Sequence, residues 1–324
     1  MVPEFGLKPQ NAYHKGQNGC RKDNSVRLPP EWPEADKAEE FAKQHGLGFH
    51  AHTLYWPKHN WPACFMVSRD TQRAFIRAFA KQIAGAKFCD VLNEIFWKVR
   101  SQDGNGKLFA LFDADEDFTE FDVWSQVLSS DMLPITGKQR LDFLVFIVQT
   151  LRDDLADLNS ANTRLLINED QLTWPGKGPI IKRKAMLGFL DYMEEQDARL
   201  DGVGLQGHIH ADIGVDADGT KGFIQDLGRK NYEVHFSELD YDNTKDDSLN
   251  RKSDEKHAEA FRGLLSACLP EANVKRVGFW GLVDMEHHLT NGNPKARPTL
   301  FEIPSNPKPV FSAVAEIIEA QTAR

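Results

Sequence analysis

Apolar residues along the chain form two kinds of pattern: short continuous runs, and longer stretches in which they recur every three or four residues. The second pattern predicts helices. Over residues 70–84 it begins at Asp70, the expected N-cap, and stops at Gly85. Helices are expected on this basis at about 34–45, 70–84, 137–158, 179–199, 220–231, 254–268 and 308–322. The short runs predict strands at 47–54, 87–93, 164–168, 202–207, 233–237 and 276–283.

Strand-like runs and helical patterns alternate over the full length of the chain. This order is typical of a parallel sheet covered by helices. The strands are short and numerous, and no glycine-rich phosphate-binding turn follows any of them, which favours a closed barrel over an open sheet. The expected fold class is therefore α/β, a TIM (β/α)8-type barrel, as a single domain over residues 1–324. In such a barrel the catalytic groups lie at the carboxyl ends of the strands.

One region departs from this alternation. Residues 99–134 are acidic and aromatic, without a helical or strand period. They are expected to form a long insertion between strand 87–93 and helix 137–158. This insertion either packs on its own aromatic side chains or forms a wall over the active face of the barrel.

Composition and charge restrict the expected partners. The 324 residues carry 39 Lys and Arg against 48 Asp and Glu, a net charge of −9, so binding to nucleic acid phosphates is not expected. No apolar run approaches the ~20 residues that span a bilayer, and no signal peptide is visible. No CxxC or zinc-ribbon spacing occurs, so no metal is expected; the cysteines are Cys20, Cys64, Cys89 and Cys268.

Polar and aromatic side chains follow the predicted strands. The set comprises His52 with Trp56, Asn93 with Glu94, Asn168 with Glu169, Gln206 with His208, Glu238 with Asp240, and Trp280 with Asp284. Amides and histidines bind hydroxyl groups, and indole rings stack on the apolar faces of sugars. Two carboxylates are what cleavage of a glycosidic bond requires, one as acid/base and one as nucleophile or base. The set therefore predicts a site for carbohydrate hydrolysis.

Six segments resemble, in order, the motifs of glycoside hydrolase family 10, the retaining β-1,4-xylanases built on a TIM barrel. They are HTLYW (52–56), DVLNE (90–94), LLINEDQ (165–171), GVGLQGHI (202–209), SELD (237–240) and FWGLVD (279–284). DVLNE is similar to the segment that carries the family's acid/base glutamate. SELD is similar to the segment that carries its nucleophile.

The resemblance implies a role for each matching residue. Glu94 would be the acid/base and Glu238 the nucleophile, and burial after an apolar strand would help Glu94 to keep a proton. Substrate binding would fall to Asn11, His52, Trp56, Asn93, Gln206, His208 and Trp280. Supporting positions behind these groups would be Asn168, Asp240 and Asp284. The implied substrate is a xylan-like β-1,4-linked polysaccharide, no cofactor is needed, and the implied location is extracellular.

The sequence departs from the family pattern where distal sugars would bind. The family's ENxMKW segment is replaced by PQNAYHKG, which retains Asn11. Pro57 stands where the family has a histidine, His59 where it has a glutamine, and His288 where it has a second tryptophan. The two glutamates are thus retained while the sugar-binding rim differs.

Two other functions remain open from the residues alone. A metal-dependent hydrolase of the amidohydrolase kind would use His50 with His52, His208 with His210, and Asp284, because alternate strand residues share a face. Such an enzyme would leave Asn93, Glu94, Glu238 and Trp280 without a role. The other alternative is an inactive barrel that binds glycan without cutting it, which the altered rim favours and the two retained glutamates oppose.

The start of the chain predicts an incomplete barrel. The family match places a strand at 5–12 and a whole strand–helix unit before it, yet few residues precede Pro9. We therefore expect seven strands and a barrel that lacks its first βα unit, with a gap between strand 276–283 and segment 5–12.

Overall fold

The computed structural model describes residues 7, 32–57, 68–96, 137–245, 251–293, 295–302 and 306–322. The chain divides into two compact units. One consists of Met1–Asn168 with Ala185–Gly202, and the other of Glu169–Lys184 with Val203–Arg324. The predicted insertion at 99–134, the predicted strand at 5–12 and Asn11 lie outside the described residues, so the expected barrel gap stays a prediction. None of the described helices is long and apolar enough to cross a membrane.

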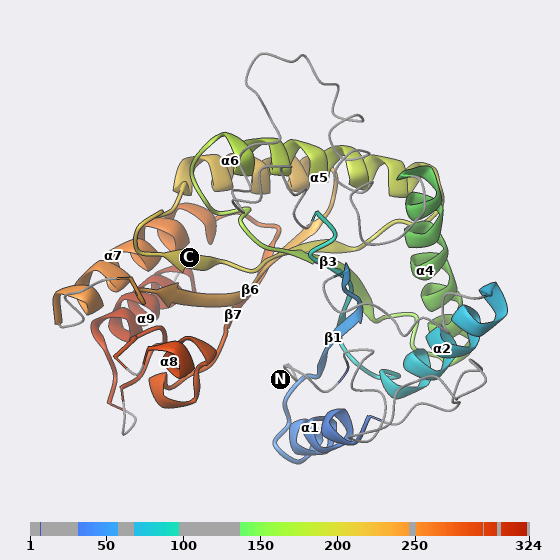
Figure 1. Cartoon of the computed structure of the whole chain (residues 1–324), viewed down its shortest axis with the longest axis horizontal. Helices are drawn as coiled ribbons and strands as arrows, with labels where there is room; N and C mark the ends of the chain where they lie inside the picture. Colours follow the sequence, from blue (N-terminus) through green and yellow to red (C-terminus); the bar gives the residue numbers. More distant parts are fainter. Residues whose placement is uncertain are drawn as a thin grey trace. The chain divides into compact units, whose positions relative to one another are not determined.

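The first unit contains three parallel strands that pair in chain order. They are β1 (His50–Tyr55), β2 (Phe88–Asn93) and β3 (Arg164–Glu169), with β2 in the middle. The helices are α1 (Pro33–Gln44), α2 (Arg69–Gln82) and α4 (Gly137–Asp157), with α5 (Lys177–Glu195) extending into both units. Figure 1 shows α2 and α4 packed side by side. Strands and helices thus alternate as the sequence predicts.

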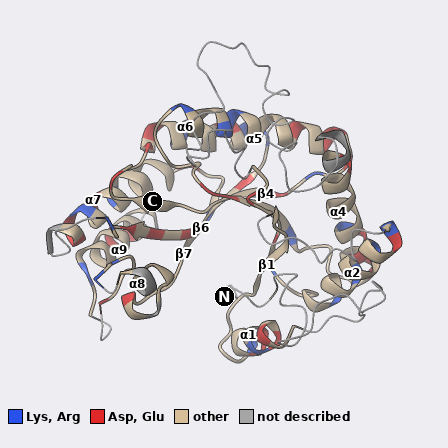
Figure 2. Ribbon diagram, viewed as in Figure 1, with Lys and Arg blue, Asp and Glu red and all other residues tan. Residues whose placement is uncertain are grey.

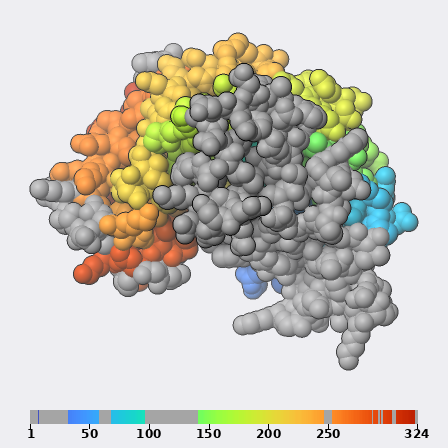
Figure 3. Space-filling view, turned by 45° about the horizontal axis from the view of Figure 1, so that its top comes forward, coloured from blue at the N-terminus to red at the C-terminus, as the bar shows by residue number. Residues whose placement is uncertain are grey.

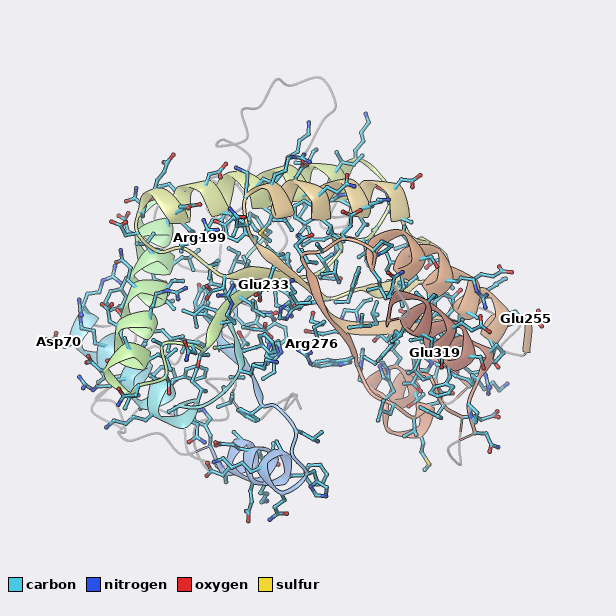
Figure 4. The ribbon with its side chains drawn as sticks, turned by 180° about the vertical axis from the view of Figure 1, so that it is seen from behind. Asp70, Arg199, Glu233, Glu255, Arg276 and Glu319 are labelled. Carbon is cyan, nitrogen blue, oxygen red and sulfur yellow. The ribbon has the colours of Figure 1, made fainter. Side chains whose placement is uncertain are left out.

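Helix α2 shows how local sequence sets an element's start. Its N-cap is Ser68, whose Oγ accepts a hydrogen bond from the backbone N–H of Thr71. The expected N-cap, Asp70, is instead in the first turn, at the end of α2 labelled in Figure 4. There its charge still favours the helix dipole. The prediction was wrong by two residues because serine and aspartate are both good caps.

The second unit is organised around one long strand, β6 (Glu233–Asp242). It pairs with β4 (Gly202–Leu205), with β5 (His208–His210) and with β7 (Val274–Phe279). The helices are α6 (Ala217–Arg229), α7 (Arg251–Cys268), α8 (His288–Gly292) and α9 (Pro309–Thr322), with a 3-10 turn η4 at Asp284–Glu286. Helix α7 packs against both α6 and α9, and Figure 3 shows α6 and α7 in yellow and orange on the surface.

Two predicted strands differ from the observed ones. The strand expected at 202–207 is divided into β4 and β5 at Gly207, which has φ 77°. This φ favours glycine, and a Cβ atom there would lie 2.6 Å from Cδ2 of Leu239, so any other residue would also displace that side chain. The strand expected at 276–283 ends at Phe279, and Gly281 with φ 88° follows in the turn toward η4.

Strand β6 is longer than predicted. It was expected to stop at residue 237, but it continues to Asp242 and includes Glu238 and Asp240. These charged side chains are buried, and the acidic part of β6 is coloured red in Figure 2. The strand continues because β5 pairs with this part of it, matching His208 with Asp240.

Candidate active site

Glu94 lies directly after β2, where the strand ends. Its φ of 47° turns the chain, and its backbone N–H donates to the carbonyl of Asn168 over 2.9 Å. The side chain is buried, with 8% of the residue exposed. Nε1 of Trp56 donates a hydrogen bond of 3.0 Å to Oε2 of Glu94. Trp56 therefore contacts the candidate acid/base directly, in addition to the sugar contact expected for it.

A buried carboxylate holds the histidines of β1. Oδ2 of Asp90 lies 2.9 Å from Nε2 of His50 and 2.8 Å from Nδ1 of His52. Burial alone would raise the pKa of Asp90, but the two histidines outweigh it and hold that pKa well below its usual range. The Asp90 carbonyl also accepts a hydrogen bond of 2.7 Å from Oγ1 of Thr53. The imidazole of His52 is thereby fixed by its neighbours on β1 and β2.

The amides expected beside Glu94 also meet. Nδ2 of Asn168, near the end of β3, donates a hydrogen bond of 3.0 Å to Oδ1 of Asn93, at the end of β2. Both side chains are fully buried. Asn168 therefore orients Asn93 from the neighbouring strand, as its supporting position in the sequence implies.

In the second unit, His208 lies between two carboxylates of β6. Nε2 is 3.2 Å from Oε2 of Glu238, and Nδ1 is 2.8 Å from Oδ1 of Asp240. Burial opposes the charged ring, but the two carboxylates outweigh it and raise the pKa of His208 well above its usual value. His208 is therefore an imidazolium that donates to both carboxylates. Burial likewise would raise the pKa of Asp240, but the histidines keep it well below its usual range.

Gln206 and Trp280 complete the predicted residues around Glu238. The Gln206 carbonyl accepts a hydrogen bond of 2.9 Å from the Glu238 backbone N–H. The Trp280 backbone N–H donates to the Leu239 carbonyl over 3.1 Å, and its indole lies edge-on to His208 with ring centres 6.4 Å apart. Trp280 is partly exposed, as a ring that stacks on a ligand must be.

The Asp284 carboxylate is held by neighbouring protein groups. It lies 2.9 and 3.1 Å from Nζ of buried Lys308, and it accepts hydrogen bonds from the backbone N–H and Oγ1 of Thr299. Burial lowers the pKa of Lys308, against the opposing effect of Asp284. Nζ also donates to the Arg297 carbonyl over 3.0 Å. Asp284 therefore joins the end of β7 to the segment before α9.

The histidine pairs do not form the metal centre of the amidohydrolase alternative. His50 and His52 share Asp90, His208 is held by Glu238 and Asp240, and Nδ1 of His210 lies 3.2 Å from Oδ2 of Asp242. Within the described ranges, the group spaced like metal ligands is a different one, Asp240 with His287 and His288.

Trp174 was not anticipated. Its Nε1 donates a hydrogen bond of 2.7 Å to the His208 carbonyl, and its ring lies edge-on to His210 at 4.7 Å. Trp174 lies in the loop that follows β3. The Asp216 backbone N–H donates to the carbonyl of Thr173 in this loop, and Nη2 of Arg183 lies 2.6 Å from Oδ2 of Asp216. These contacts fix the position of the loop. A tryptophan shortly after a barrel strand is the signal that could have identified it.

The predicted site residues thus gather in two groups, one in each unit. The first group contains His52, Trp56, Asn93, Glu94 and Asn168. The second contains Gln206, His208, Glu238, Asp240, Trp280 and Asp284. Each group offers one glutamate supported by indole, imidazole or amide groups at the carboxyl ends of parallel strands. This is the chemistry of a carbohydrate-hydrolysing enzyme with two carboxylates.

Comparison with known proteins gives the same class. The family model for glycosyl hydrolase family 10 matches residues 2–317. Endo-1,4-beta-xylanase 3 of Hypocrea jecorina is 24% identical over 327 residues, covering 98% of this chain and 75% of that protein. The chain belongs to glycosyl hydrolase family 10 and is an endo-1,4-β-xylanase-like glycoside hydrolase, as the motifs predict. The metal-dependent alternative is therefore wrong.

Solved structures show the same fold. Xylanase 10B of Thermotoga petrophila, in complex with xylobiose, has a TM-score of 0.71 at 19% identity and covers 99% of this chain and 85% of its own. The intracellular xylanase TsXylA of Thermoanaerobacterium saccharolyticum has a TM-score of 0.68 at 21% identity, with coverage of 97% and 86%. The expected TIM barrel fold is confirmed.

Proposed function

We propose that this chain hydrolyses internal β-1,4 bonds of a xylan-like polysaccharide with retention of configuration, using Glu238 as nucleophile and Glu94 as acid/base. The observation that carries the proposal is the pairing of Glu238 with His208, whose charge is maintained by Asp240. The His208 imidazolium lies 3.2 Å from Oε2 of Glu238 and orients that carboxylate. An ionised carboxylate is what attack on an anomeric carbon requires.

The reaction has two steps. In the first, Glu238 forms a bond to the anomeric carbon while the glycosidic bond breaks, and Glu94 donates its proton to the departing oxygen. In the second, Glu94 takes a proton from water, whose oxygen attacks the anomeric carbon and releases Glu238. The hydrogen bond from Trp56 to Oε2 of Glu94 favours Oε1 as the oxygen that carries the proton.

The substrate follows from the same residues. His52, Asn93 and Gln206 offer groups for sugar hydroxyls, Trp280 offers a partly exposed indole face, and Asn11 would contact a more distant sugar. The relatives named above are endo-1,4-beta-xylanases, and one solved structure holds xylobiose. A xylan-like chain is therefore the proposed substrate.

This proposal includes one catalytic domain over residues 1–324 with an insertion at 99–134, because Glu94 and Glu238 must act on the same bond. For a retaining enzyme their carboxyl groups should lie ~5–5.5 Å apart. We also propose an extracellular location, as the family resemblance implies; fractionation of the source cells would test it.

The test is the stereochemistry of the first product. Hydrolysis of xylohexaose, followed by NMR at early times, should release the β-anomer. Glu238→Gly should lose nearly all activity and, with added azide, form the α-glycosyl azide, because azide replaces the missing nucleophile on the opposite face. Release of the α-anomer by the wild-type enzyme would contradict the mechanism, and binding without turnover would favour the inactive barrel.

A further inference from the structure

His287 is buried beside Asp240, and its two ring nitrogens have different neighbours. Nδ1 accepts a hydrogen bond of 3.2 Å from the backbone N–H of Leu289, through which His287 caps α8. An accepting ring nitrogen carries no proton, so in the neutral ring the proton is on Nε2. Nε2 lies 3.2 Å from Oδ2 of Asp240, an electrostatic contact between two side chains that are almost fully buried.

Asp240 thereby connects two histidines. Its Oδ2 faces His287, while its Oδ1 accepts the 2.8 Å hydrogen bond from Nδ1 of His208. The other nitrogen of His208 donates to Glu238. A continuous series of polar contacts thus runs from the cap of α8 to Glu238, entirely within the second unit.

We infer that His287 is a positioning residue for Glu238, acting through Asp240 and His208; this inference rests on the function proposed above. The N–H on Nε2 fixes the rotation of the Asp240 carboxylate, so that Oδ1 is presented to His208. His208 then keeps both its charge and its orientation toward Glu238. His287 lies outside the six sequence motifs, which end at Asp284.

The same side chains also suit a metal ion in their spacing, because the ligand atoms of Asp240, His287 and His288 lie within 4.8 Å of one another. The hydrogen bond that Nδ1 accepts favours a donor instead. A nitrogen that binds a metal must offer a lone pair, whereas the N–H of Leu289 on Nδ1 leaves the proton on Nε2, on the side that faces Asp240. A metal site and a positioning N–H give different outcomes in the experiment below.

Two titratable groups lie directly against His287. They are Asp240 of β6 and exposed His288 of α8, while His208 of β5 lies on the other oxygen of the Asp240 carboxylate. Burial lowers the pKa of His288, and the neighbouring His287 and His208 lower it further against the effect of Asp240. Near neutral pH, His288 is therefore uncharged. The charge in direct contact with His287 is that of Asp240, and the imidazolium of His208 lies on the other side of that carboxylate.

Two variants separate the cap from the contact with Asp240. His287→Asn places a carbonyl oxygen where Nδ1 was, so it keeps the cap on Leu289 but does not reach Asp240. His287→Gln places an amide N–H where Nε2 was, so it reaches Asp240 but disturbs the cap. We expect His287→Asn to lower kcat/KM about tenfold, the order of one polar contact with a buried charge. We expect His287→Gln to retain most of the activity at a lower melting temperature.

The pH profile is the decisive measurement. Without the N–H of His287, Asp240 takes up a proton at higher pH. Protonated Asp240 no longer maintains the charge of His208, so the acidic limb of the kcat/KM profile should move to higher pH in His287→Asn. The limb should stay in place in His287→Gln. The control is Thr290→Val, which removes the 2.6 Å hydrogen bond from Oγ1 to the His287 carbonyl and loosens α8 without touching Asp240. Its limb should also stay in place.

Four results would overturn the inference. An unchanged kcat/KM in His287→Asn together with a loss in His287→Gln would make His287 a helix cap only. Loss of wild-type activity in EDTA, restored by Zn²⁺, would make Asp240, His287 and His288 a metal site. Failure of azide to rescue Glu238→Gly would refute the nucleophile assignment, and the inference with it. Azide rescue together with a wild-type profile in His287→Asn would refute the inference alone.

Discussion

Nε1 of Trp56 donates a hydrogen bond of 3.0 Å to Oε2 of Glu94. The indole comes from the residue after β1 and the carboxyl group from the residue after β2, so the pairing of these two strands sets the contact. Trp56 therefore contacts the carboxyl group of Glu94, the proposed acid/base, directly.

Replacing Trp56 by Phe should therefore impair proton donation while retaining an aromatic ring. Loss of one hydrogen bond to a charged group corresponds to about 1.5–3 kcal/mol, so kcat/KM on xylan should fall roughly 10- to 100-fold. Aryl xylosides with good leaving groups need little protonation and should be much less affected. The basic limb of the pH–rate profile should move to higher pH, because the carboxylate loses a donor. Equal losses on both substrates would indicate that Trp56 serves only sugar binding.

Trp174 should act on Glu238 through the backbone of His208. Trp174→Phe removes the N–H that the His208 carbonyl accepts over 2.7 Å, while a ring remains against His210. A partly buried carbonyl that loses its donor costs about 1 kcal/mol, so thermal unfolding should occur at a lower temperature. We also expect kcat to fall several-fold with little change in KM. An unchanged kcat in the variant that melts earlier would limit Trp174 to a structural role.

Lys308 should be essential to the stability of the second unit. Lys308→Met leaves the Asp284 carboxylate buried without its cation, a loss of about 3–5 kcal/mol in the free energy of unfolding. The double variant Lys308→Met with Asp284→Asn removes the buried charge and should recover part of that stability. Urea denaturation of the three proteins measures both effects. A double variant no more stable than Lys308→Met would contradict an electrostatic cause.

The sequence predicted the repeating strands and helices because these depend on local periodicity. It also predicted which strand ends carry the candidate site residues, since DVLNE and SELD each combine a strand with its glutamate. It did not predict the end of β6, where an apolar run gives way to buried charges. Those charges are tolerated because β5 supplies His208 as a partner for both and His287 contacts Asp240 as well.

Contacts between segments that are far apart in the sequence were the other features that could not be predicted from it. The strand divides at Gly207, where a Cβ atom would meet the Leu239 side chain, and the role of Trp174 depends on its distance from the His208 carbonyl. Lys308 stands 24 residues after Asp284, with no periodic pattern to connect them. Each of these features arises from packing in three dimensions, which single-sequence patterns do not encode.

Asp90 gives a prediction for acid stability. Its pKa is held well below its usual range by His50 and His52, against the effect of burial, so the folded protein keeps this carboxylate ionised when the unfolded chain has already bound a proton. The stabilisation is present above about pH 4, the unfolded pKa of aspartate, and is lost as the pH falls toward the folded value. Melting temperature should therefore decline below about pH 4 in the wild type.

The matched variant is Asp90→Asn, which keeps the shape of the side chain and removes the charge. At neutral pH it should be less stable than the wild type, because His50 and His52 lose their ionised partner. Below about pH 4 its melting temperature should decline less steeply. Without the Asp90 carboxyl group, the unfolded chain binds one proton fewer relative to the folded protein. Calorimetry of both proteins from pH 7 to pH 3 measures the two slopes. Parallel slopes would show that Asp90 does not carry the acid sensitivity, whatever its effect on stability at neutral pH.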